Sequence, residues 1–133
     1  IQIIRKNPHV IFDVSHNEQS ILEFCKTIKQ HNFQGKKTLV ISIQKTKEIK
    51  KSAKELMKNF DHIICTRLNQ RMFSKRNLMH MFASSKKLDY TNKPKKIITN
   101  TIKNAGHHDL LAIIGTHYWG EHIEKIFKIS LNF

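Results

Sequence analysis

The chain has 133 residues and a mass of 15.7 kDa, which is enough for one domain with a sizeable core and too little for two. Its hydrophobic fraction of 39% and charged fraction of 26% are typical of globular domains, and its short apolar runs exclude a membrane-spanning helix. Two cysteines without a CxxC pair, Cys25 and Cys65, argue against a disulfide scaffold and a thiolate zinc site. We therefore expect a cytoplasmic protein without membrane association.

The net charge of +14 makes a polyanionic partner such as nucleic acid the first hypothesis to weigh. However, the positive charge comes from 20 lysines and only 4 arginines. Arginine is the residue preferred for bidentate recognition of guanine and phosphate. A lysine excess of this kind is more typical of a solvated surface, so a nucleic-acid-binding module remains an alternative rather than the favoured reading.

The first half of the chain predicts a hairpin followed by a helix. Residues 1–4 and 9–14 are strand-like and flank a turn at Asn7-Pro8, so they could pair as an antiparallel hairpin. From residue 17 to about 31 the apolar residues recur at helical spacing. Ser15 and Glu18 at the start of this segment resemble a capping box.

Strands and helices then alternate to the end of the chain. Apolar strands are predicted at 38–43, 62–66 and 110–114, and helical stripes at 49–60, 74–82, 98–105 and 119–127. The lysine-rich segment from Asp89 to Lys96 is predicted to be a loop, and Pro94 marks it as non-helical. This order predicts an α/β fold with a Rossmann-like open, mostly parallel sheet, one antiparallel edge strand and helices on both faces.

In such sheets, ligands bind outside the carboxyl ends of the strands, where loops lead into helices. Four loops should share that edge, at residues 13–17, 42–47, 66–71 and 115–118. In the first of these loops, the structural interpretation is that the polar residues cap the following helix. The alternative is that Asp13 accepts from a ribose hydroxyl or orients a cation while His16 reaches a phosphate, and residue types alone leave both open.

The segment Pro8-His9-Val10-Ile11-Phe12-Asp13-Val14-Ser15-His16-Asn17 resembles the P-x-hhh-D-x-[AS]-H-N signature of the Mur ligase family, in its folylpolyglutamate synthase / dihydrofolate synthase branch. Gly115-Thr116-His117-Tyr118 resembles the G-[ST]-x-[YH] turn of that family. Two further likenesses are weaker. Lys47-Glu48 lies where the family tends to carry D-K-D, with Thr46 and Glu48 in place of the usual acids. Gln70-Arg71 lies where the family tends to carry Pro-Arg, with Gln70 in place of the proline.

The resemblance implies that residues 1–133 form the C-terminal, glutamate ligase domain of an ATP-dependent amide ligase. It implies that ATP phosphorylates the carboxylate of dihydropteroate or a folate, and that L-glutamate then displaces phosphate from this acyl phosphate. ATP and Mg²⁺ would be held mainly by an N-terminal P-loop domain, and no P-loop run occurs here. We therefore expect a fragment that is inactive alone and works with its own N-terminal domain, as a monomer.

The same resemblance assigns roles to individual residues. Asp13, His16 and Asn17 would contact ATP, with His16 also catalytic near the transferred phosphate. Thr116 and His117 would help to bind glutamate, and Lys47 and Arg71 are lesser candidates for neutralising phosphate or a glutamate tail. No metal site is expected in this segment, because His117 and His122 are spaced i, i+5 and do not share one helical face.

Two alternatives remain besides the folate branch. One is the corresponding domain of a peptidoglycan-precursor Mur ligase, which shares the fold and part of the signature. The other is a freestanding basic nucleic-acid-binding α/β module, which would leave the pairing of Asp13 with His16 unexplained. The D-x-S-H-N form together with the 115–118 turn favours the folate branch.

Overall fold

A computed structural model describes residues 1–131 of the chain, which form six strands and five helices. The strands are β1 (Gln2–Lys6), β2 (His9–Phe12), β3 (Lys37–Ile41), β4 (His62–Thr66), β5 (Leu88–Thr91) and β6 (Leu110–Ile114). The helices are α1 (Glu18–His31), α2 (Lys50–Asn59), α3 (Lys75–Met81), α4 (Pro94–Asn104) and α5 (Trp119–Phe127).

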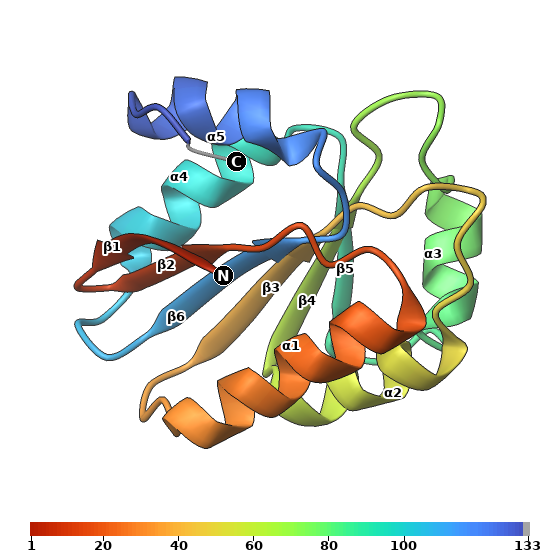
Figure 1. The fold of residues 1–133 in the computed structure, drawn as a ribbon, viewed down its shortest axis with the longest axis horizontal. Coiled ribbons are helices and arrows are strands. Elements are labelled where there is room, and N and C mark those ends of the chain that lie inside the picture. Colours follow the sequence, from red (N-terminus) through yellow and green to blue (C-terminus); the bar gives the residue numbers. More distant parts are fainter. Residues whose placement is uncertain (132–133) are drawn as a thin grey trace.

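The strands form one sheet in the order β1-β2-β6-β3-β4-β5. β1 pairs with β2 in an antiparallel arrangement, and all other neighbouring strands are parallel. Helices α1 and α2 lie along one face, whereas α4 and α5 lie along the other (Figure 1). The open, mostly parallel sheet with one antiparallel edge strand is therefore confirmed.

The inner strands are apolar throughout because both of their faces are covered. Alternate residues of β3 illustrate this: Leu39 and Ile41 belong to the core cluster under α1, α2 and α3, whereas Val40 belongs to the cluster under α4 and α5. Trp119 is fully buried in the second cluster, and its indole N–H donates to the carbonyl oxygen of Ile114 at 2.8 Å. The sheet is thus packed between two hydrophobic cores, which hold the carboxyl ends of its strands in position.

Two predictions about local structure were wrong. The segment predicted as a loop from Asp89 to Lys96 contains strand β5 and the start of α4, with Pro94 at the first helical position. Proline suits that position because the first helical N–H has no intrahelical acceptor. β5 escaped detection because it is a polar edge strand in which only Leu88 is buried.

The second wrong prediction is that Ser15 and Glu18 form the capping box of α1. Asn17 is the N-cap residue, and its side-chain oxygen accepts from the amide of Ser20 at 2.8 Å. The Ser20 hydroxyl accepts in return from the Asn17 amide at 3.2 Å. The Glu18 carboxylate instead accepts from the amides of Lys51 and Ser52, at 2.9 and 2.7 Å, and so caps the first turn of α2.

None of the helices that the structure describes combines the length and apolar character needed to cross a bilayer.

Candidate functional site at the carboxyl edge of the sheet

The loop after β6 lies where neighbouring connections diverge. α5 follows β6 on one face, whereas the helices after the flanking strands β2 and β3 pack on the opposite face. Gly115 allows the loop after β6 to pack directly against the loop after β3. Its φ is +115°, and a Cβ there would overlap the carbonyl oxygen of Ser42. The place between such diverging connections, at the carboxyl ends of the strands, is the crevice in which α/β sheets bind ligands. In this chain it corresponds to the place between the loops at 13–17 and 115–118.

Asp13 lies on one side of this crevice, directly after β2. Its amide donates to the carbonyl oxygen of Ile113 at 3.1 Å, which places the loops after β2 and β6 side by side. One carboxylate oxygen accepts from the hydroxyl and, at 2.8 Å, from the amide of Ser15, and the other lies 2.8 Å from the amino nitrogen of Ile1. Burial alone would raise the pKa of Asp13, but these interactions outweigh it and hold the pKa below its ordinary value.

His16 and Asn17 follow at the N-terminus of α1. The His16 Nδ1 atom lies 3.0 Å from the carbonyl oxygen of Val14, which can only accept, so Nδ1 donates. In the neutral ring this leaves Nε2 as the proton acceptor. The side-chain oxygen of Asn17 is used by the helix cap, so its NH₂ group is the part that could donate to a ligand. This helix start also favours an anion through the aligned backbone dipoles.

Thr116 and His117 lie on the other side of the crevice. Thr116 is 1% exposed, and its hydroxyl oxygen accepts from the amide of Tyr118 at 3.3 Å. His117 is exposed and packs against the Tyr118 ring, with 4.3 Å between ring centroids. The structure therefore brings together the two predicted groups, the loop at residues 13–17 and the loop at 115–118.

Arg71 reaches the same crevice through a contact that the sequence did not reveal. Its guanidinium donates to the Tyr118 hydroxyl and lies over the Tyr118 ring, 5.7 Å from the centroid. Tyr118 was predicted only as part of a turn motif, although its hydroxyl and ring together hold a cation at the site. A tyrosine next to predicted binding residues at the end of a buried strand is the signal that could have found it.

Lys47 lies away from this group of residues. It lines a separate groove between the β3–α2 loop and α3, together with Lys45 and Arg76. The structure therefore divides the two lesser candidates, placing Arg71 at the crevice and Lys47 at the groove.

The remaining reactive side chains are not at the crevice. Cys25 and Cys65 are buried free thiols, and burial raises the pKa of each to about 12, so neither is a nucleophile. Among residues 1–131, no three His, Cys, Asp or Glu side chains are grouped closely enough to hold a metal ion. The chemistry at the edge therefore depends on the carboxylate, imidazole, hydroxyl, amide and guanidinium groups of the loops at 13–17, 66–71 and 115–118.

A doubly wound sheet with a polar crevice beside its central strand defines the class of ligand-binding α/β domains whose site lies at the carboxyl edge. Within this class, residues 1–117 match the family model described as Mur ligase, glutamate ligase domain, and the chain belongs to this family. The resemblance drawn from the signature at 8–17 is thereby confirmed.

Solved structures agree on the fold. Escherichia coli FolC in complex with ADP superposes with a TM-score of 0.83 at 20% identity, over 96% of this chain and 30% of that chain. The bifunctional folylpolyglutamate synthase/dihydrofolate synthase of Yersinia pestis, complexed with AMPPNP and Mn ion, gives 0.83 at 19% identity, over 96% and 30%. Folylpolyglutamate synthase of Mycobacterium tuberculosis, complexed with ADP and AMPPCP, gives 0.77 at 15%, over 98% and 32%.

The chain thus spans about a third of the length of these proteins. A comparison of the sequence with curated proteins finds no match.

Proposed function

We propose that the chain is the C-terminal domain of an ATP-dependent amide ligase that adds L-glutamate to dihydropteroate or a folate through an acyl phosphate. The observation that carries this proposal is the pairing of two loops, 13–17 and 115–118, at one crevice, held by the hydrogen bond from the Asp13 amide to Ile113. The family match supports a ligase domain, and the likeness to solved folylpolyglutamate synthases supports the folate branch. We expect the complete protein to be a cytoplasmic monomer.

The loop at 13–17 is suited to the nucleotide side of the reaction. The hydroxyl and amide of Ser15 donate to the Asp13 carboxylate and favour its ionised form, so it can accept from a ribose hydroxyl or orient a cation. His16 presents the nitrogen opposite its Val14 contact, where it can hold a proton near a transferred phosphate. The Asn17 amide and the start of α1 would complete the contacts to ATP.

The loop at 115–118 is suited to glutamate. The Thr116 hydroxyl and the exposed His117 ring supply hydrogen-bonding groups, and Arg71 supplies a planar cation that can bind a carboxylate in bidentate fashion. Two loops that close on one substrate would position the amine against the acyl phosphate and exclude water, which phosphoryl-transfer chemistry requires.

The divalent ion of this chemistry is not held by the described residues alone, since Asp13 is the one carboxylate that they bring to the crevice. Such an ion neutralises phosphate charge when bound. Asp13 could supply one oxygen ligand, and the other ligands, like most contacts to ATP, are assigned to the N-terminal domain of the complete protein.

The test is a ligase assay on the complete gene product, which measures phosphate release from ATP with dihydropteroate and L-glutamate. We expect release that needs both substrates, and a fall in kcat of at least about 100-fold for Asp13→Ala and for His16→Ala. The matched controls are Asp89→Ala and His62→Ala, which change the same residue types near the amino ends of β4 and β5, where His62 Nε2 lies 2.6 Å from Asp89 Oδ2. Normal turnover in both crevice variants would refute the proposal.

A further inference from the structure

A groove of about 730 Å³ lies between the β3–α2 loop and α3. Its lining contains none of the crevice residues, so it is a separate site. Backbone pairing holds its base: the amide of Lys45 donates to the carbonyl oxygen of Arg71 at 2.9 Å, and the amide of Phe73 donates to that of Ile43 at 2.7 Å. These bonds fix the two walls relative to each other, and the volume is that of an ordinary ligand site.

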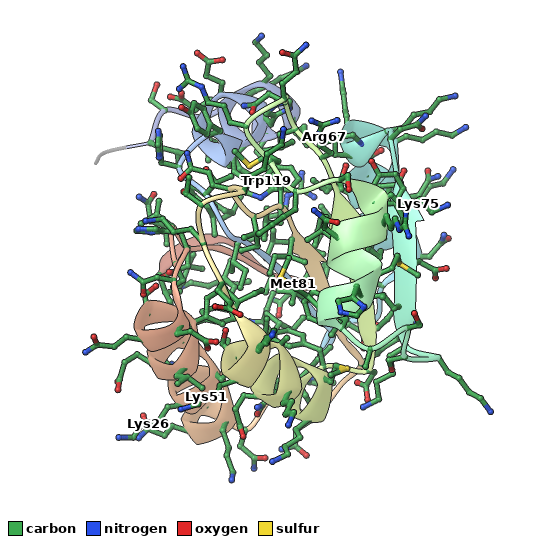
Figure 2. The ribbon with its side chains drawn as sticks, turned by 90° about the vertical axis from the view of Figure 1, so that its right-hand side faces the viewer. Lys26, Lys51, Arg67, Lys75, Met81 and Trp119 are labelled. Carbon is green, nitrogen blue, oxygen red and sulfur yellow. The ribbon has the colours of Figure 1, made fainter. Side chains whose placement is uncertain are left out.

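The α3 wall of the groove is one face of the helix. Arg76 and His80 are spaced i, i+4, and so are the adjacent Asn77 and Met81. Neighbouring i, i+4 rows lie on the same side of a helix. Met81 accordingly lies on the side of α3 that faces the β3–α2 loop (Figure 2). This wall therefore offers a cation, an imidazole, an amide and a thioether to whatever occupies the groove.

The opposite wall is basic. Lys45 and Lys47 line it from the loop, and Lys50 lines it from the start of α2. Glu48 is the one carboxylate in the lining, and it pairs with Lys50 at 3.4 Å. Within residues 1–131, no carboxylate lies at ion-pair distance from Lys45, Lys47 or Arg76. Both walls thus carry cations without counter-ions, and an acidic occupant would remove their mutual repulsion.

Between the basic walls the groove has an apolar floor. Phe73, Met79 and Met81 are half-buried, and they pack against the core cluster on the α1 and α2 side of the sheet. Methionine side chains are unbranched and adapt to apolar surfaces of different shapes. A groove with an apolar floor and charged rims is suited to an amphipathic helix, whose apolar face packs on the floor while its charged flanks meet the rims. Because these rims are positive, the matching flanks are acidic.

A nucleic acid fits this groove less well. Single-stranded nucleic acids are held by aromatic side chains on which successive bases stack. Phe73 is the one Phe, Tyr or Trp side chain among the lining residues, and it is half-buried against the core. Arg76 is also the one arginine in the lining, although arginine is the residue preferred for bidentate phosphate contacts. The floor and the cation type therefore favour a peptide.

We propose that this groove docks an acidic amphipathic helix of a partner protein. The apolar face of the helix packs on Met79 and Met81, and its carboxylates reach Lys47 on one rim and Arg76 on the other. The charge complementarity and the apolar floor are properties of the groove itself, so the proposal does not rest on the ligase function.

The test is fluorescence anisotropy with the complete gene product and a labelled probe peptide of about 14 residues, in which leucines at i, i+3, i+4 and i+7 are flanked by glutamates. We expect binding that weakens as salt is raised, because the rim contacts are ionic. A peptide of identical composition, with its leucines scrambled out of the stripe, should bind at least about tenfold more weakly.

Variants of the groove separate its walls from its floor. Charge reversal of both walls, Lys47→Glu with Arg76→Glu, should weaken binding of the striped peptide at least about tenfold, and the neutral pair Lys47→Gln with Arg76→Gln should give a smaller loss. Met81→Gln keeps the length of the side chain but removes its apolar character, and it should weaken binding at least about threefold. Circular dichroism should show the same fold in each variant.

The matched control is Lys26→Glu with Lys103→Glu, which changes the net charge by the same amount at exposed positions outside the groove lining. Lys26 lies on the outer surface of α1, away from α3 (Figure 2). The control pair should bind the striped peptide within about twofold of the wild type. An equal loss in both charge-reversal pairs would show general charge attraction and overturn the proposal.

Three further outcomes would overturn it. One is an absence of peptide binding at low salt, and another is equal binding of the striped and scrambled peptides. The third is tighter groove-dependent binding of a single-stranded oligonucleotide with the same number of negative charges, which would assign the groove to nucleic acid. The assay uses neither ATP nor folate, so its result is independent of whether the protein is a ligase.

Discussion

The two edges of the same parallel sheet use polar side chains in different ways. At the amino edge, carboxylates are used to join loops. Asp109 accepts from the amides of Gly106 at 2.8 Å and Lys36 at 2.9 Å, and Asp61 accepts from the amide of Lys37 at 2.8 Å. These groups are satisfied within the domain.

At the carboxyl edge, polar groups remain without a partner of their own. Lys47 has no carboxylate partner among the described residues, and the buried hydroxyl of Thr66 makes no hydrogen bond within them. Arg71 is held by a neutral tyrosine rather than by an acid. The comparison indicates that the carboxylates of the amino edge stabilise the fold, while Lys47, Thr66 and Arg71 at the carboxyl edge retain capacity for further polar contacts.

The largest effect on stability should come from Gly115 at the carboxyl edge, where the backbone of one loop packs directly against that of another. Gly115→Ala would place a Cβ against the Ser42 carbonyl oxygen at a φ that L residues avoid. We expect a loss of about 3 kcal/mol or more in the free energy of unfolding, measured by urea denaturation. Gly106→Ala is the control, because its Cβ would meet nothing closer than 3.7 Å. Equal stability of the two variants would contradict this reading.

The next effect tests the amino edge. Asp109→Ala removes two hydrogen bonds between loops, and we expect a loss of about 2 kcal/mol, whereas Asp61→Ala removes one and should cost about half as much. The backbone amides of Gly106 and Lys36 lower the pKa of Asp109. Its contribution is therefore present above pH 3.8, the ordinary value, and is lost as the pH falls through the lowered pKa. Acid titration of unfolding would check this, since wild type and Asp109→Asn should converge only at low pH.

A smaller effect on stability, with a larger one on binding, should follow at the carboxyl edge. Tyr118→Phe keeps the ring under Arg71 but removes the hydroxyl contact. We expect a stability change below about 1 kcal/mol and, in the proposed ligase assay on the complete gene product, a KM for glutamate raised about three- to tenfold. Tyr90→Phe, whose ring lies under Lys75 instead, is the control. A loss of stability without a change in the KM for glutamate would show that Tyr118 has a structural role, like Asp109 and Asp61, and no role in binding.

The smallest effect concerns His122 on α5. Burial, reinforced by the nearby charge of Lys125, lowers the pKa of this half-buried ring. The folded state therefore binds its proton less readily than the unfolded chain, and stability should decline as the pH falls below about 6.5. His122→Gln should flatten this decline in thermal unfolding between pH 5 and 7. If the decline of stability with pH were the same in this variant, groups other than His122 would be its cause.

The sequence predicted the parts of the fold that depend on burial. β3 and β6 were detected because strands covered on both faces are apolar throughout, and the parallel order then placed Asp13 and Thr116 at one edge. β5 was missed because an edge strand that carries Asp89 lacks this signal. The contacts of Tyr118 with Arg71 and of Glu18 with α2 join segments far apart in sequence, and no local pattern encodes such distances.

The buried thiols have a practical consequence for studying the site. Because the pKa of Cys25 and of Cys65 is raised to about 12, almost no thiolate forms at neutral pH, and burial also blocks reagents. A cysteine introduced at the exposed Gln70, beside Arg71, would then be the only one to react with a maleimide dye. The native chain can thus carry a single spectroscopic label at the carboxyl edge without removal of either natural cysteine.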